Sequence, residues 1–108
     1  MATFSFEGKS HKRYVYIELP WSEPLKVPLQ AGILILAAGT SANPIPKMII
    51  KDISPRALFF RISNLAIAEF GAHLLFVHAE GDSDARSAEL LDLIAAYHLP
   101  VNPRIAPT

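Results

Sequence analysis

The stretch Gly32-Ile33-Leu34-Ile35-Leu36-Ala37-Ala38 is apolar at every position. A strand with one face in water alternates apolar and polar residues, whereas an unbroken apolar run of this length is typical of a strand covered on both faces. We therefore expect this stretch to be an interior strand of a sheet, with the rest of the chain arranged around it.

Four further segments have strand patterns, at residues 3–7, 13–19, 47–51 and 72–78. The first two are separated by a short Gly-containing turn and predict a hairpin. Segment 13–19 alternates strictly, so its tyrosines share one face while its valine, isoleucine and final leucine share the other. Prolines and small polar residues in the intervening segments predict loops there.

Two segments have helix signals. Ser54 followed by Pro55 is a good helix start, and the apolar spacing that follows predicts a helix over residues 55–70, ended by Gly71. Asp82 or Ser83 caps a second predicted helix that continues to about residue 98. The expected core face of this second helix consists of Leu90, Leu93, Ile94 and Tyr97.

The order of these elements predicts the fold class. Four strands, a helix, a strand and a second helix with short connections indicate an α+β two-layer sandwich, with a small mixed or antiparallel sheet and two main helices on one side. A chain of 108 residues is the size of a single domain. We expect residues 1–31 to form an N-terminal hairpin and Pro-rich loop, and residues 32–104 to form the core.

Composition excludes several classes of protein. With 51% hydrophobic residues the chain can bury a core, which excludes intrinsic disorder, and without cysteine it can form neither disulfides nor thiolate metal sites. No signal-peptide pattern and no apolar run of membrane-spanning length are present. The expectation is a soluble, cytoplasmic protein without a membrane partner.

The net charge of zero conceals a gradient along the chain. Residues 1–61 carry eight basic and four acidic side chains, a difference of +4, and residues 62–108 carry two basic and six acidic ones, a difference of −4. A polyanion such as DNA or RNA would prefer the first half, although a basic hairpin turn can also be basic simply because it is solvated. The candidate nucleic-acid contacts are Lys9, Lys12, Arg13, Lys47 and Lys51.

Glu89 is the acidic residue with the most informative position. On a helical wheel it falls near Leu93 and Ala96, at the margin of the buried stripe. A partly desolvated carboxylate there can bind a metal ion or accept a proton, whereas the alternative is a boundary glutamate whose head reaches water. His73 and His78 are five residues apart on a predicted strand, so they are not expected to bind one ion together.

The ordered segments Gly32-Ile33-Leu34, Met48-Ile49-Ile50, Leu93-Ile94-Ala95-Ala96-Tyr97 and Pro100-Val101-Asn102-Pro103 resemble the layout of the GIY-YIG nuclease superfamily. The resemblance covers about residues 32–104. It implies catalytic roles for Arg56, Arg61 and Glu89, a metal site at Glu89, and Mg²⁺ or Mn²⁺ as the cofactor of an active, metal-dependent phosphodiesterase.

Both signature tripeptides lack the tyrosine of that family, with Leu34 in the first and Met48-Ile49-Ile50 as the second. Leucine and methionine can neither donate nor accept a proton. The resemblance therefore implies a degenerate domain that binds nucleic acid or a partner and has lost strand cutting. Tyr14 and Tyr16 are candidates to occupy the vacant phenol positions.

Two alternatives remain open. One is a structural or interaction module, for example a homodimer, which the high apolar content favours. The other is a nucleotide-binding fragment, because Leu36-Ala37-Ala38-Gly39 followed by Pro46-Lys47-Met48 resembles the opening of the sugar-phosphate nucleotidyltransferases.

Overall fold

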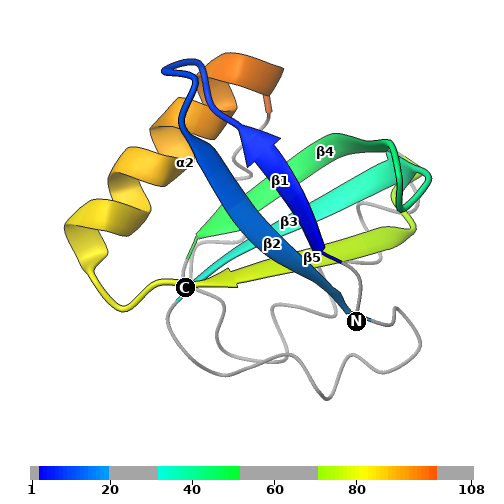
Figure 1. Ribbon diagram of the computed structural model, residues 1–108, viewed down its shortest axis with the longest axis horizontal. Helices are drawn as coiled ribbons and strands as arrows, with labels where there is room; N and C mark the ends of the chain where they lie inside the picture. Colours follow the sequence, from blue (N-terminus) through cyan, green and yellow to red (C-terminus); the bar gives the residue numbers. More distant parts are fainter. Residues whose placement is uncertain (1–2, 20–31, 52–70, 100–108) are drawn as a thin grey trace, which may run out of the picture.

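The computed structural model describes residues 3–19, 32–51 and 71–99, which form five strands and one helix (Figure 1). The elements in chain order are β1 (Thr3–Glu7), β2 (Arg13–Leu19), β3 (Gly32–Gly39), β4 (Pro44–Lys51), β5 (Leu74–Ala79) and α2 (Ser83–Tyr97). The helix expected over residues 55–70 lies outside the described residues.

The five strands form one sheet in the order β1-β2-β5-β3-β4, and all four pairings are antiparallel. β3 lies between β5 and β4, with Leu34 opposite both Val77 and Ile50. The side chains of Ile33, Leu34, Ile35 and Leu36 are all fully buried. The prediction of an interior strand in this stretch is therefore confirmed.

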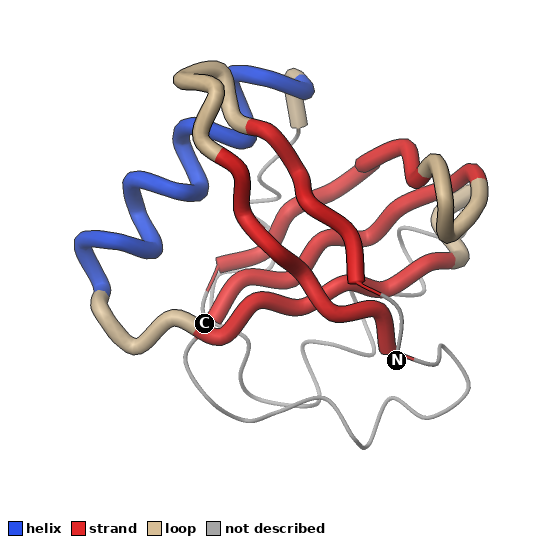
Figure 2. Tube along the Cα trace, viewed as in Figure 1, coloured by secondary structure: helices blue, strands red, loops and turns tan. Residues whose placement is uncertain are grey.

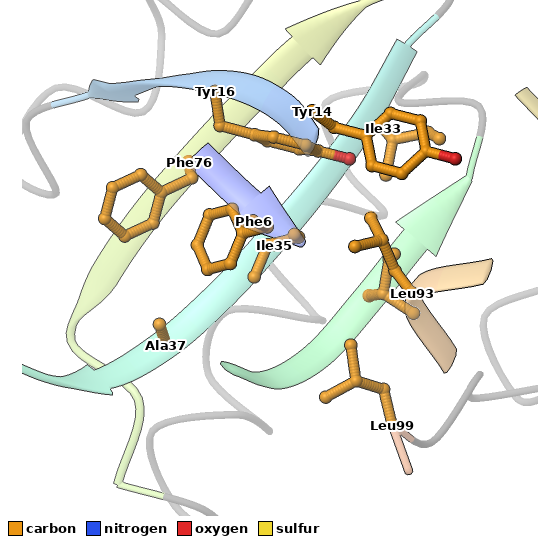
Figure 3. Close-up of a cluster of buried hydrophobic side chains, with 10 residues drawn as sticks. Phe6, Tyr14, Tyr16, Ile33, Ile35, Ala37, Phe76, Leu93 and Leu99 are labelled. Atoms are coloured by element: carbon orange, nitrogen blue, oxygen red, sulfur yellow. The ribbon is translucent and has the colours of Figure 1, made fainter. Parts of the chain in front are cut away.

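The sheet is strongly curled. The β1–β2 hairpin crosses the other three strands at a steep angle (Figures 1 and 2). The ring of Phe6 on β1 lies 5.3 Å from that of Phe76 on β5, although β2 separates these two strands in the sheet. Figure 3 shows the resulting core, in which Phe6 and Tyr16 lie beside Phe76 and Ile35.

The helix α2 packs on the open side of this curl. Asp82, one of the two predicted caps, accepts the Asp84 amide in the first turn, and His98 ends the helix in a left-handed conformation. Leu93 is fully buried, and the other three predicted core residues of the helix pack around the core as partly buried side chains. The described residues contain no helix that is long and apolar enough to cross a membrane.

The predicted fold class is wrong for the described residues, which form a curled antiparallel five-stranded sheet with one helix and not a two-helix sandwich. The physical reason lies in the N-terminal hairpin. Phe6 and Tyr16 fold over the apolar face of β3 and β5 and are fully buried there. The sheet thus covers part of its own core face, which the prediction had assigned to helices.

One local prediction also changes, and the structure decides which face of β2 is buried. β4 begins at Pro44 and not at residue 47, because a register shift between Leu36 and Ala37 lets both prolines sit in an edge strand. On β2 the tyrosine face is the buried one, whereas Val15 and Ile17 are about half exposed. The buried tyrosines therefore point toward α2, which positions the site described next.

Candidate functional site

Two tyrosines and two carboxylates meet between β2 and α2. Tyr14 and Tyr16 are two residues apart on a strand, so they share a face, and Glu89 and Asp92 are three apart on a helix, so they also share a face. The hydroxyl of Tyr16 donates to Glu89 Oε2 at 2.5 Å, and that of Tyr14 donates to Asp92 Oδ2 at 2.8 Å. The two pairs connect the strand to the helix side by side.

Glu89 is a buried carboxylate, with 4% of its side chain exposed. Its two oxygens each lie 2.9 Å from Nδ1 of His78, the residue before the end of β5. One carboxylate therefore accepts hydrogen bonds from two different strands, and its charge is turned toward protein donors. The ring of His78 also lies 5.4 Å from that of Tyr16, so the three side chains form one compact group.

The acidity of both phenols is reduced at this site. Burial, followed by the hydrogen bond to Glu89, raises the pKa of Tyr16. Burial and the hydrogen bond to Asp92 raise the pKa of Tyr14 to about 12. Both hydroxyls consequently keep their protons to a higher pH than an ordinary tyrosine does and act as donors to the carboxylates.

Asp92 fastens the β1–β2 turn to the helix. Its carboxylate accepts the Ser10 amide at 2.9 Å and the Ser10 hydroxyl at 2.7 Å, and its carbonyl accepts the Lys9 amide at 3.2 Å. These bonds lower the pKa of Asp92, with the Ser10 hydroxyl as the largest cause. A Cβ at Gly8 would lie 2.0 Å from Asp92 Oδ2, so glycine is required for this close approach.

An open pocket of about 350 Å³ lies between this turn and the start of α2. Its polar lining consists of Lys12, Arg13, Tyr14, His78, Glu80 and Glu89. The ammonium of Lys12 lies 5.5 Å from the centre of the Tyr14 ring. The guanidinium of Arg13 is 3.4 Å from Glu7, and because both side chains are well exposed this ion pair is weak.

The acidic residues before α2 have capping contacts in the structure. Glu80 Oε1 accepts the Asp82 amide, and Asp82 in turn accepts the Asp84 amide. Arg86 donates to the Glu80 carbonyl at 2.8 Å and so holds the loop between β5 and the helix. Among residues 3–19, 32–51 and 71–99, no group of three or more histidines or carboxylates is placed to hold a metal ion.

The structure brings together only part of the predicted site. Glu89, Lys12 and Arg13 line the same pocket. Lys9 lies exposed on the turn beside it, whereas Lys47 and Lys51 are on β4, at the far edge of the sheet from β1. Arg56 and Arg61 lie outside the described residues, so their proposed roles stay predictions.

Sequence reasoning missed His78 and Asp92 as members of the site. The five-residue spacing of His73 and His78 predicts only that they do not bind one ion together, and His73 lies before β5 and is exposed. The spacing of Glu89 and Asp92 on one helix face was the available signal for the second carboxylate. The partner of His78 lies only 11 residues further along the chain, and the contact depends on how α2 packs against the end of β5, which the pattern of neither segment predicts.

Comparison of the chain with models of protein families, with curated proteins and with solved structures found no match. The resemblances to the GIY-YIG nucleases and to the nucleotidyltransferases therefore stay predictions.

Proposed function

We propose that this chain binds nucleic acid at the pocket between the β1–β2 turn and α2, with backbone phosphates on Lys12 and Arg13. The observation that supports this most is that both cations line one pocket together with Tyr14 and His78. Arginine pairs with phosphate through parallel N–H donors, and lysine supplies a compact positive charge.

The turn that carries these cations is held in place before any ligand arrives. Its Ser10 is bonded twice to Asp92, and the Gly8 amide is bonded to the Lys12 carbonyl at 2.8 Å. A fixed turn loses less conformational entropy when it binds a phosphate. This anchoring favours a binding role over that of a solvated turn that is polar for no further reason.

The two carboxylates that line the pocket are compatible with an anionic ligand. Glu89 presents little charge to it, because both oxygens accept hydrogen bonds and the side chain is buried. Glu80 is engaged with the helix cap. A metal ion at Glu89 would have to displace Tyr16 or His78, so metal-dependent strand cutting is not part of the proposal.

The test is binding of a short fluorescent single-stranded RNA, and of DNA with the same sequence, followed by anisotropy. The double variant Lys12→Ala/Arg13→Ala should weaken binding by on the order of tenfold or more and reduce the salt dependence by roughly one unit of slope per lost contact. Lys9→Ala is the matched control, since it removes one charge from the same turn but lies outside the pocket lining. Equal losses in both variants would refute a role for the pocket.

A second candidate function is self-association, which the outer face of β2 favours. Val15 is 54% and Ile17 42% exposed, and the two are neighbours on that face. Light scattering over a range of concentrations tests this candidate. A constant monomer mass, or a dimer that persists in Val15→Ser/Ile17→Ser, would argue against it.

A further inference from the structure

His78 occupies the boundary between a buried carboxylate and the pocket. Its Nδ1 lies 2.9 Å from each oxygen of Glu89, and its side chain is 28% exposed against 4% for Glu89. Its other nitrogen, Nε2, has no hydrogen-bond partner among the residues that the structure describes. The ring thus has one nitrogen held by the protein and one available to a molecule in the pocket.

A carboxylate on one ring nitrogen fixes the tautomer of a neutral histidine. Because Glu89 accepts from Nδ1, the proton resides on Nδ1 and the lone pair on Nε2. Tyr16 donates to the same carboxylate from β2 and restricts its rotation. The Glu89 carboxylate therefore has a fixed orientation, and it fixes the orientation of the His78 ring. This is the arrangement that a general base requires.

We propose that His78 is a general base for metal-independent cleavage of RNA bound in this pocket. The proposal rests on the proposed function, because the substrate has to be the bound nucleic acid. Glu89 and Tyr16 are positioning residues in it, and Lys12 and Arg13 are the cations that face the phosphate.

The reaction is an internal transfer within the RNA. His78 Nε2 accepts the proton of a ribose 2′-hydroxyl, and the 2′ oxygen forms a bond to the adjacent phosphorus. The bond from phosphorus to the 5′ oxygen breaks, its electron pair leaves with that oxygen, and a solvent water protonates it. The hydroxide so formed takes the proton from His78, which leaves a 2′,3′-cyclic phosphate and a 5′-hydroxyl as products.

RNA is the substrate that matches the groups present. Its nucleophile is already attached next to the phosphorus, which gives the attack a high effective concentration without a bound metal hydroxide. The remaining requirement is stabilisation of the extra negative charge on the phosphorane, which Lys12 and Arg13 can supply in the pocket. DNA lacks the 2′-hydroxyl, and therefore this mechanism predicts that DNA is bound but not cut.

The experiment uses the full chain with a labelled single-stranded RNA, and DNA of the same sequence, in the presence of EDTA. We expect RNA cleavage with cyclic phosphate ends and intact DNA. His78→Ala should lower the rate by about a hundredfold or more at unchanged RNA affinity. Added imidazole should restore part of the rate, an effect that loss of a structural histidine would not show.

Several results would overturn the inference. RNA that is bound but stays intact in EDTA contradicts it and leaves the proposed function standing, whereas failure to bind either nucleic acid removes both. Equal cleavage by wild type and His78→Ala, purified identically, would identify a contaminant. His73→Ala is the matched control, because His73 is exposed outside the pocket with its Nε2 2.9 Å from the Gly39 carbonyl, and it should cleave like wild type.

The positioning residues have their own readout. Glu89→Gln and Tyr16→Phe should lower kcat by about tenfold or more while KM stays unchanged, because they alter the orientation of His78 and not the phosphate contacts. Circular dichroism establishes that each variant is folded. A change in KM alone would assign both residues to the binding surface and refute the positioning role.

Discussion

The Tyr16 hydroxyl donates to Glu89 Oε2 at 2.5 Å, between two residues that are 73 positions apart in the chain. Tyr16 is fully buried and Glu89 nearly so. An ionised carboxylate in such surroundings is costly unless several donors point at it. Tyr16 and His78 provide these donors from two neighbouring strands, β2 and β5. The group is therefore both a structural connection and a candidate site.

Tyr16→Phe should destabilise the chain by about 1–3 kcal/mol, because the buried carboxylate loses one of its donors. Tyr14→Phe is the comparison, and its cost should be about 1 kcal/mol or less, since Asp92 keeps both bonds from Ser10. Urea unfolding followed by circular dichroism measures both. An equal loss of unfolding free energy in the two variants would show that the burial of Glu89 does not determine the cost of losing its hydrogen-bond donor.

Gly8→Ala should detach the β1–β2 turn from the helix and cost about 1–2 kcal/mol, because the added Cβ would lie 2.0 Å from Asp92 Oδ2. Gly81→Ala is the matched control, since nothing lies within 4 Å of a Cβ at that position. Thermal unfolding of the two variants provides the measurement. An equal fall in Tm for both would contradict the close approach.

Asp92→Asn should cost less than about 1 kcal/mol near neutral pH, because the carboxylate is only partly covered. Bonds from Ser10 hold the pKa of Asp92 in the folded chain below its usual value near 3.8. Stability from this shift is therefore present above pH 3.8 and lost as the pH falls through the lowered pKa. The difference in unfolding free energy between wild type and Asp92→Asn should shrink in that pH range, as measured by urea unfolding at several pH values. A difference that grows on acidification would refute the assignment.

Tyr14 should ionise near pH 12 in the folded chain, since burial and Asp92 raise its pKa to about 12 from 10.0. Stability from this shift is fully present below pH 10.0 and is lost as the pH rises through about 12. The absorbance of the phenolate, compared between wild type and Tyr14→Phe, isolates this residue. A difference spectrum that titrates close to pH 10 would contradict a buried, hydrogen-bonded phenol.

Two stretches with clear local patterns were predicted well from the sequence. The apolar run of β3 is buried from Gly32 to Ala37, and α2 begins after Asp82, one of the two predicted caps. Both depend on local patterns, an unbroken apolar run for β3 and a cap followed by apolar residues at helical spacing for α2. Fold class was predicted wrongly because the coverage of a sheet face depends on segments that are distant in the sequence.

The same division applies to the site. Glu89 and the basic turn could be proposed as site residues from the sequence because their positions on a helix face and in a hairpin are local properties. The contact of Glu89 with Tyr16 could not, because the two residues are 73 positions apart and the contact requires β2 to pair with β5 across more than fifty intervening residues. The pairing of distant strands depends on the burial of the whole core. The hydrophobic periodicity of one segment does not indicate which distant strand it pairs with.

By itself, the sequence determined that Tyr14 and Tyr16 share a face, that Glu89 lies at the margin of the buried stripe of its helix, and that β3 is interior. Tertiary structure alone decided that the tyrosines contact Glu89 and Asp92. It also decided that His78 contacts Glu89 and that Lys12 and Arg13 line the adjoining pocket. The physical reason is that backbone geometry fixes the direction of neighbouring side chains, whereas only the packing of the complete sheet against α2 selects which directions converge.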